Sequence, residues 1–238
     1  MDLRIKDVAE LLNVSETTIR RWLADGKIPA YRINQQYRFS RTEVEDWVIR
    51  YKQGKSHGES PFGESSSEAS HGSGGSKQFS LYRAVHKGRV LAGVPGNSKE
   101  EVIRATVKAI VNDLNLDADV LTDLLLDREN LQPTALNNGI GIPHARDFLL
   151  SSHHDIVNVV FPEKPLPYGA LDGKLVHTLF FLFACDDKRH LHLLAKIAHF
   201  TSEPATLSLL QRQPDKDRLL EYIKSWESNL NQATPAFT

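Results

Sequence analysis

The chain has 238 residues, of which 25% are charged and 40% are hydrophobic, and its formal net charge is −1 at pH 7. This length suits two domains of ordinary size and argues against one large enzyme core. The single cysteine, Cys185, excludes an intramolecular disulfide and a cysteine-ligated metal cluster.

The sequence predicts a cytoplasmic protein that does not associate with a membrane. Residues 1–4 lack the apolar stretch of a secretory signal. The most apolar run, Leu175 to Cys185, falls far short of the roughly 20 residues of a membrane-spanning helix, so we expect a buried strand there. A single cysteine also suits a reducing compartment.

The first segment of the chain concentrates positive charge. Between Ser15 and Arg41 six basic residues stand against two acidic ones, a local balance of +4. Apolar residues recur there at helical spacing, as Val8, Leu11 and Leu12 and again as Ile19, Trp22 and Leu23. Ser15 is a good N-cap for the second helix, and Gly26 ends it. We therefore expect two short helices with a tight joint.

A hairpin and a third helix are expected next. Residues 28–33 and 37–39 alternate in polarity as the strands of a hairpin do, around a polar tip at residues 34–36. Residues 40–43, Ser-Arg-Thr-Glu, form a capping box ahead of a further apolar helical pattern. The predicted order is helix, turn, helix, wing, helix.

Residues 8–48 read VAELLNVSETTIRRWLADGKIPAYRINQQYRFSRTEVEDWV. This stretch resembles the excisionase-type, MerR-related winged helix-turn-helix family along nearly its whole length. The resemblance implies that the second helix enters the major groove of DNA and that the wing lies along phosphates or the minor groove.

Six side chains are the expected DNA-binding residues: Thr18, Arg20, Arg21, Lys27, Arg32 and Arg38. The first three supply donors for base edges and phosphates, and the other three place positive charge beside the DNA backbone. The alternative interpretation is that these arginines form an ordinary solvated helix face.

A Ser/Gly-rich stretch separates this segment from the rest of the chain. Ser56 to Ser76 contains 8 Ser and 5 Gly in 21 residues and almost no apolar side chain, so it cannot offset its chain entropy by burial. We therefore expect a DNA-binding domain at 1–55, a flexible linker at 56–77, a larger domain at 78–230 and a tail at 231–238.

The larger domain has the pattern of an α/β layered fold, with a mixed sheet flanked by helices. Ser98 opens a capping box before a helix with one apolar face. Ile156 to Phe161 and Leu175 to Ala184 are nearly continuous apolar runs, as in strands buried on both faces. Further helical stripes follow, and strands that alternate with helices indicate layers of both.

The chemistry of this domain gathers in residues 134–146, which read TALNNGIGIPHAR. A Gly-rich approach followed by Pro143-His144 holds an imidazole at a strand end, where a partner protein can reach it. Together with residues 94–102, 128–131 and 190–194, this segment resembles the fructose/mannitol-type enzyme IIA domains of the bacterial phosphoenolpyruvate sugar phosphotransferase system, including the nitrogen-regulatory branch. The resemblance runs from about Lys87 to Trp226.

The resemblance implies a role for three side chains. His144 is the phosphoacceptor, since a neutral imidazole nitrogen is nucleophilic at cytoplasmic pH. Arg128 is the active-site arginine that pairs with the phosphoryl group, and His190 is a second histidine that hydrogen-bonds it. Outside the family pattern, a histidine on an apolar helical stripe, such as His190, is more often a packed core residue. The pattern predicts no metal site and no cofactor.

The leading hypothesis is a regulator in which an HPr-type phosphocarrier phosphorylates His144 and the added charge alters DNA binding or the choice of a regulatory protein partner. One alternative is a carrier that passes the phosphoryl group to a separate IIB transport protein. Another is a binding regulator that is never phosphorylated. In each case the chain is a phosphohistidine carrier or binder rather than a turnover enzyme. A single winged module usually binds DNA weakly, so a homodimer is also expected.

Overall fold

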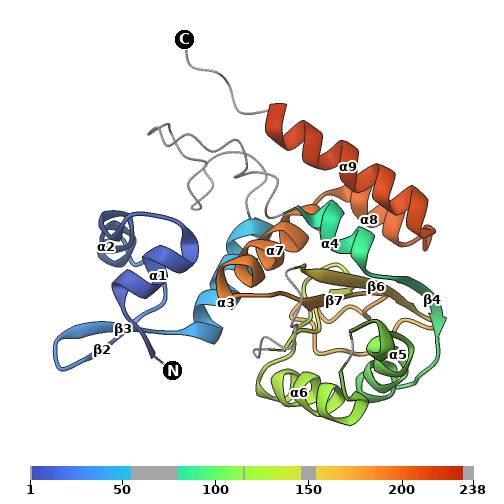
Figure 1. Ribbon diagram of the computed structural model, residues 1–238. Coiled ribbons are helices and arrows are strands. Elements are labelled where there is room, and N and C mark those ends of the chain that lie inside the picture. The colour runs from blue at the N-terminus through green and yellow to red at the C-terminus, as the bar shows by residue number, and fades with distance from the viewer. Residues whose placement is uncertain (1, 55–79, 115, 146–153, 233–238) are drawn as a thin grey trace. The chain divides into compact units, whose positions relative to one another are not determined.

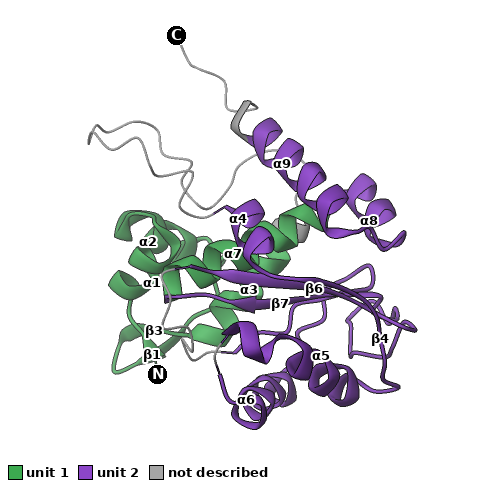
Figure 2. Ribbon diagram, turned by 45° about the vertical axis from the view of Figure 1, so that its right-hand side comes forward, with its two compact units in different colours: residues 1–79, 187–202 green, residues 80–186, 203–238 purple. Residues whose placement is uncertain are grey.

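The computed structural model describes residues 2–54, 80–114, 116–145 and 154–232, and these residues form two compact units. Unit 1 contains the residues before position 80 together with residues 187–202, and unit 2 contains the remainder (Figure 2). The expected linker at 56–77 and residues 233–238 of the expected tail lie outside the described residues.

Unit 1 begins with the two helices of a helix-turn-helix. Helix α1 (Ile5–Leu12) ends at Asn13, which adopts a left-handed conformation with φ 55°. Helix α2 (Glu16–Ala24) starts at Ser15, whose hydroxyl accepts a hydrogen bond from the Thr18 N–H at 3.1 Å. The expected N-cap is therefore confirmed, and it fixes the tight joint between the helices.

The wing is a small antiparallel sheet. Strands β2 (Tyr31–Ile33) and β3 (Gln36–Ser40) pair with Ile33 opposite Gln36, so the turn holds only Asn34 and Gln35. Both turn residues have positive φ, as a two-residue hairpin turn requires. A third strand, β1 (Asp2–Leu3), pairs with the other edge of β3 and was not expected from the sequence.

Helices α3 (Arg41–Gly54) and α7 (Asp187–Phe200) complete unit 1. We call residues 2–54 the winged module. Helix α7 comes from the segment that the sequence assigns to the larger domain, yet its Leu191 and Ala195 are buried in the hydrophobic cluster of the winged module. That cluster includes Val8, Leu12, Ile19, Trp22, Phe39, Val44 and Val48. The core of unit 1 is thus built from two distant parts of the chain.

Unit 2 contains a four-stranded mixed sheet in the order β4-β6-β7-β5. The strands are β4 (Val90–Val94), β5 (Ile140–Gly141), β6 (Ile156–Pro162) and β7 (Thr178–Phe183). Strands β6 and β7 are antiparallel, whereas β4 pairs with β6 and β5 pairs with β7 in parallel. All six residues of β7 are buried, which confirms that the apolar run is a strand covered on both faces.

Helices flank both faces of this sheet. Helices α5 (Lys99–Leu114) and α6 (Ala118–Leu131) cover one face, and α4 (Leu81–Lys87) lies on the other face, beside α9 (Lys216–Gln232) (Figure 1). A short helix, α8 (Pro204–Leu210), precedes α9. The predicted fold class, a small winged helix-turn-helix with a helix-flanked mixed sheet, is confirmed.

Within the described ranges, none of the helices is both long enough and apolar enough to cross a membrane.

Candidate functional site

A hairpin in unit 2 delivers His144 to the edge of the sheet. Its turn contains Asn138 and Gly139, both with positive φ. Gly139 has φ 77°, and a Cβ there would lie 2.6 Å from Cδ2 of His177, so the turn requires glycine for conformation and for space. The Leu136 N–H donates to the Ile140 carbonyl at 2.7 Å and closes the hairpin.

His144 continues the second arm of this hairpin and lies beside β7. It forms a parallel bridge with Leu182, whose N–H donates to the Pro143 carbonyl at 3.0 Å. Nδ1 of His144 lies 2.6 Å from the carbonyl oxygen of Ile142. A carbonyl oxygen only accepts hydrogen bonds, so Nδ1 carries a proton, and whenever the ring is neutral the lone pair is on Nε2.

The side chain of His144 is only 1% exposed. The sequence pattern predicts an imidazole that a partner protein can reach, so the burial differs from that expectation.

Arg128 lies in the last turn of α6 and is 3% exposed. Its Nη1 donates to the carbonyl oxygen of Gln132 at 2.9 Å. A cation in the last turn of a helix is favoured by the partial negative charge of the helix end. Arginine stays protonated even when buried, so this side chain places a fixed positive charge in unit 2.

Glu129, which the sequence analysis did not select, joins α6 to the hairpin. Its carboxylate accepts the Thr134 N–H at 3.0 Å and the Thr134 hydroxyl at 2.5 Å. The Ile142 N–H in turn donates to the Thr134 carbonyl at 3.0 Å, and Ile142 is the residue that holds the ring of His144. A chain of hydrogen bonds thus runs from the neighbour of Arg128 to His144. The sequence feature that could have indicated Glu129 is its position as a charged residue next to Arg128 on a helix with a buried face.

Glu129 is buried, with only 1% of its surface exposed. Burial raises the pKa of Glu129, and the hydrogen bonds from Thr134 and the charges of Lys99 and Arg128 oppose that shift. Burial also raises the pKa of Tyr168 well above its usual value of 10.0, with a contribution from Glu129. These shifts are typical of a dry, low-dielectric environment.

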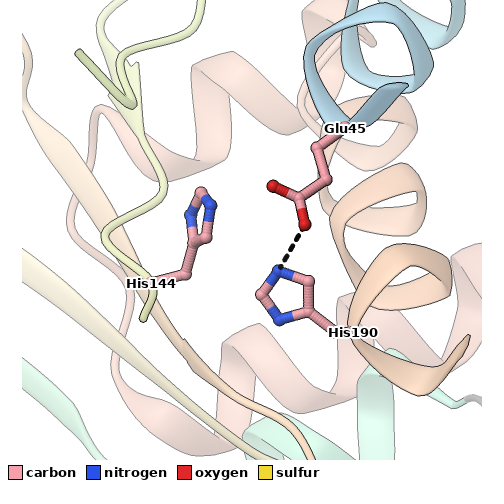
Figure 3. A group of neighbouring side chains, drawn as sticks. All are labelled: Glu45, His144 and His190. Carbon is pink, nitrogen blue, oxygen red and sulfur yellow. Dashed lines mark ion pairs between the residues drawn. The ribbon is translucent and has the colours of Figure 1, made fainter. Parts of the chain in front are cut away.

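His190 belongs to the first turns of α7 in unit 1 and is 2% exposed. Its Nε2 lies 3.9 Å from Oε1 of Glu45 on α3, and Figure 3 shows the carboxylate turned toward the imidazole. Glu45 is itself 1% exposed, and Nε of Arg41 donates to the same oxygen at 3.0 Å. Nη1 of Arg41 also lies 2.5 Å from Asp187 at the start of α7. Contacts of Arg41 with Glu45 and Asp187, and of Glu45 with His190, therefore join α7 to α3.

The expected DNA-binding side chains of α2 are only weakly held within unit 1. Arg20 and Arg21 are exposed, and Arg20 lies 3.4 Å from Glu16 in an i,i+4 pair. Exposed pairs of this kind contribute little free energy, so Arg20 can exchange Glu16 for a phosphate. The Thr18 hydroxyl is 2.9 Å from the Ser15 hydroxyl and supports the N-cap.

The expected cations of the wing carry local partners. Arg32 lies over the ring of Tyr37, with its guanidinium carbon 4.5 Å from the ring centroid. Arg38 donates to Gln36 at 2.9 Å and is half-buried. Lys27, which follows α2, lies 2.9 Å from Asp25 and is exposed. Arg32 and Arg38 are thus supported by neighbouring wing side chains, whereas the exposed pair of Lys27 with Asp25 leaves Lys27 only weakly held.

Comparison with known proteins identifies two families. The family model described as phosphoenolpyruvate-dependent sugar phosphotransferase system, EIIA 2, matches residues 84–226. A model described as helix-turn-helix domain matches residues 3–51.

Individual proteins agree with these matches. The nitrogen regulatory protein of Pseudomonas aeruginosa is 32% identical over 146 residues, which cover 60% of this chain and 94% of that protein. The transcriptional repressor DcmR of Methylorubrum extorquens is 52% identical over 46 residues, 19% of this chain and 17% of the repressor. The crystal structure of nitrogen regulatory protein IIA-Ntr from Neisseria meningitidis superposes with a TM-score of 0.53 at 20% identity, covers 60% of this chain and 98% of that one, and shows the same fold.

Proposed function

Because the chain belongs to the phosphotransferase system EIIA type 2 family and carries a helix-turn-helix domain at its start, we propose that it is a regulator in which phosphorylation of His144 controls DNA binding. The observation that carries this proposal is the hydrogen bond from Nδ1 of His144 to the Ile142 carbonyl at 2.6 Å. It orients the ring and leaves Nε2 as the nucleophile.

The transfer step uses Nε2 of His144. The donor is a phosphohistidine of the HPr type, whose ring is protonated on the nitrogen that does not carry phosphorus. Its nitrogen–phosphorus bond breaks, and the donor histidine leaves as neutral imidazole. The new bond forms between phosphorus and Nε2, so the His144 ring becomes positively charged. The Ile142 carbonyl oxygen, which already accepts a hydrogen bond from Nδ1, stabilises that charge. No cofactor takes part.

Two further side chains receive the phosphoryl group in this proposal. Arg128 neutralises its negative charge, because phosphoryl transfer depends mainly on positioning and electrostatic stabilisation. His190 donates a hydrogen bond to it. The identity of residues 128 and 190 supports both roles through the family pattern, and the burial of Arg128 strengthens its field, since a charge acts over a longer range where water is excluded.

The DNA-binding role is assigned to α2 and the wing. Thr18, Arg20 and Arg21 contact DNA from α2, while Lys27, Arg32 and Arg38 contact the phosphate backbone. Four of these six residues, Arg20, Arg21, Lys27 and Arg32, are exposed. In this proposal residues 1–55 bind DNA and residues 78–230 carry the phosphotransfer site. The similarity to a nitrogen regulatory protein and to a transcriptional repressor favours a regulatory role.

Phosphorylation in a defined system tests the proposal. The full chain is incubated with enzyme I, HPr and phosphoenolpyruvate, and acid-labile phosphate is mapped by mass spectrometry under alkaline conditions. We expect one phosphoryl group on His144 and none in the His144→Ala variant. A His144→Ala variant that takes up as much phosphate as the wild type would overturn the assignment.

The burial of His144 favours a second candidate function, a binding regulator that is not phosphorylated. In that case the wild-type chain stays unlabelled in the same reaction while a known IIA protein in a parallel reaction is labelled. Transfer of the label onward to an added IIB protein would instead support a role as a transport carrier.

A further inference from the structure

The winged module contacts the one helix of unit 1 that lies within the EIIA family match. Helix α7 falls inside residues 84–226, and its Leu191 and Ala195 are buried in the core of the winged module. This packing fixes the helix that carries His190 against the winged module.

Glu45 of the winged module also contacts His190 itself. The distance of 3.9 Å between Glu45 Oε1 and His190 Nε2 is that of an ion pair, and both side chains are almost fully buried. Oε2 of Glu45 has no hydrogen-bond partner among the described residues. A buried carboxylate that is only half satisfied depends strongly on the donors and positive charges beside it, here Arg41 and the imidazole of His190.

A phosphoryl group on His144 and the carboxylate of Glu45 would both pair with the imidazole of His190. One protonated imidazole neutralises about one negative charge, and a phosphoryl group brings roughly two at pH 7. If His190 turns its Nε2 proton toward the phosphoryl group, Glu45 loses that partner, and Arg41 is the partner that it retains among the described residues. The two anions therefore compete for His190.

We infer that Glu45 is an intramolecular competitor of the phosphoryl group for His190, so that the winged module represses phosphorylation and phosphorylation loosens the packing of α3 on α7. The inference rests on the proposed function of His144 and His190. Linkage makes the effect reciprocal, because whatever weakens phosphorylation must itself be weakened by phosphorylation. Glu45 acts through His190, as a positioning residue that does not touch the donor.

The first experiment compares Glu45→Gln with wild type in the full chain. Glutamine keeps the volume and removes the charge. With enzyme I, phosphoenolpyruvate and limiting HPr, we expect the steady-state level of phospho-His144 to be about 10-fold higher in the variant, within the usual range of coupling between sites. Glu43→Gln is the matched control, since Glu43 lies on the same helix and is exposed. It should match wild type.

A second readout uses the wild-type protein, so it does not depend on how well a variant folds. Amide hydrogen exchange is measured with and without the phosphorylation system. We expect exchange between Val44 and Tyr51 to quicken about 10-fold on phosphorylation, in line with the same coupling. In Glu45→Gln the two states should exchange alike.

The outcomes separate the two proposals. Absence of label on wild-type His144 contradicts the proposed function. A labelled His144 with an equal or lower level in Glu45→Gln, or with unchanged exchange in α3, overturns the competitor role of Glu45 and leaves the proposed function standing.

Discussion

Glu129 accepts two hydrogen bonds from Thr134, one from its N–H at 3.0 Å and one from its hydroxyl at 2.5 Å. Both residues are buried, so this contact fixes the hairpin that ends at His144 against the last turn of α6. This contact helps to fix the position of the His144 segment relative to the Arg128 segment within unit 2.

Thr134→Val should weaken this contact with little change in volume. The hydroxyl donor disappears and one carboxylate oxygen of Glu129 is left buried without it, so we expect the free energy of unfolding of unit 2 to fall by about 1–3 kcal/mol. Urea denaturation measures the change. Thr134→Ser keeps the hydroxyl and should recover most of the loss. Equal stability of the valine variant and wild type would show that the contact contributes nothing.

The buried carboxyl of Glu129 should also make stability depend on pH. Burial raises its pKa above the usual 4.5, so the folded state favours the neutral acid. The contribution of the Glu129 carboxyl group to stability is complete below its unfolded-state pKa and is lost as the pH rises through its folded-state pKa. The free energy of unfolding of wild type minus that of Glu129→Gln should therefore decrease as the pH rises from 4 to 7. A difference that increases over this range would contradict the raised pKa.

Ser15→Ala should destabilise the winged module. The Ser15 hydroxyl accepts the Thr18 N–H at 3.1 Å, and loss of an N-cap typically costs about 1 kcal/mol. Thermal unfolding followed by circular dichroism should show a lower melting temperature. Ser208→Ala, an exposed change within α8, serves as the control and should leave it nearly unchanged. Equal melting of Ser15→Ala and the control would rule out a capping role.

Arg20→Ala combined with Arg21→Ala should weaken DNA binding at every sequence. If both side chains contact phosphates, the slope of the logarithm of affinity against the logarithm of salt concentration should become shallower by about 2. Fluorescence anisotropy over a range of salt concentrations measures this slope. Arg83→Ala removes an exposed arginine of α4 and should not alter it. An unchanged slope in the double variant would remove α2 from the interface.

Local signals in the sequence predicted much of the winged module. Ser15 caps α2 because a hydroxyl at that position satisfies a free N–H, and this depends on neighbours three residues away. The hairpin was also predicted, although its tip is shorter than expected, because Gln36 pairs with Ile33 and leaves two residues in the turn. The apolar run that became β7 was recognisable since both of its faces are buried.

Other features depend on distant contacts and could not be predicted. Strand β4 contains Gly93 with φ 67° and a shift in register, so it lacks a regular alternation. The packing of Leu191 in the core of the winged module joins residues more than a hundred positions apart. The ion pair of Glu45 with His190 follows from that packing. No short pattern encodes either contact.

The most direct test of the account is the DNA affinity of the full chain before and after phosphorylation by enzyme I, HPr and phosphoenolpyruvate. Binding to the DNA preferred by the unphosphorylated protein is measured at one salt concentration, with His144→Ala treated in the same way. The account predicts that phosphorylation changes the dissociation constant of wild type at least about 5-fold, the lower end of typical coupling between sites, and leaves the variant unchanged. Equal affinities of fully phosphorylated and unphosphorylated wild type would contradict it.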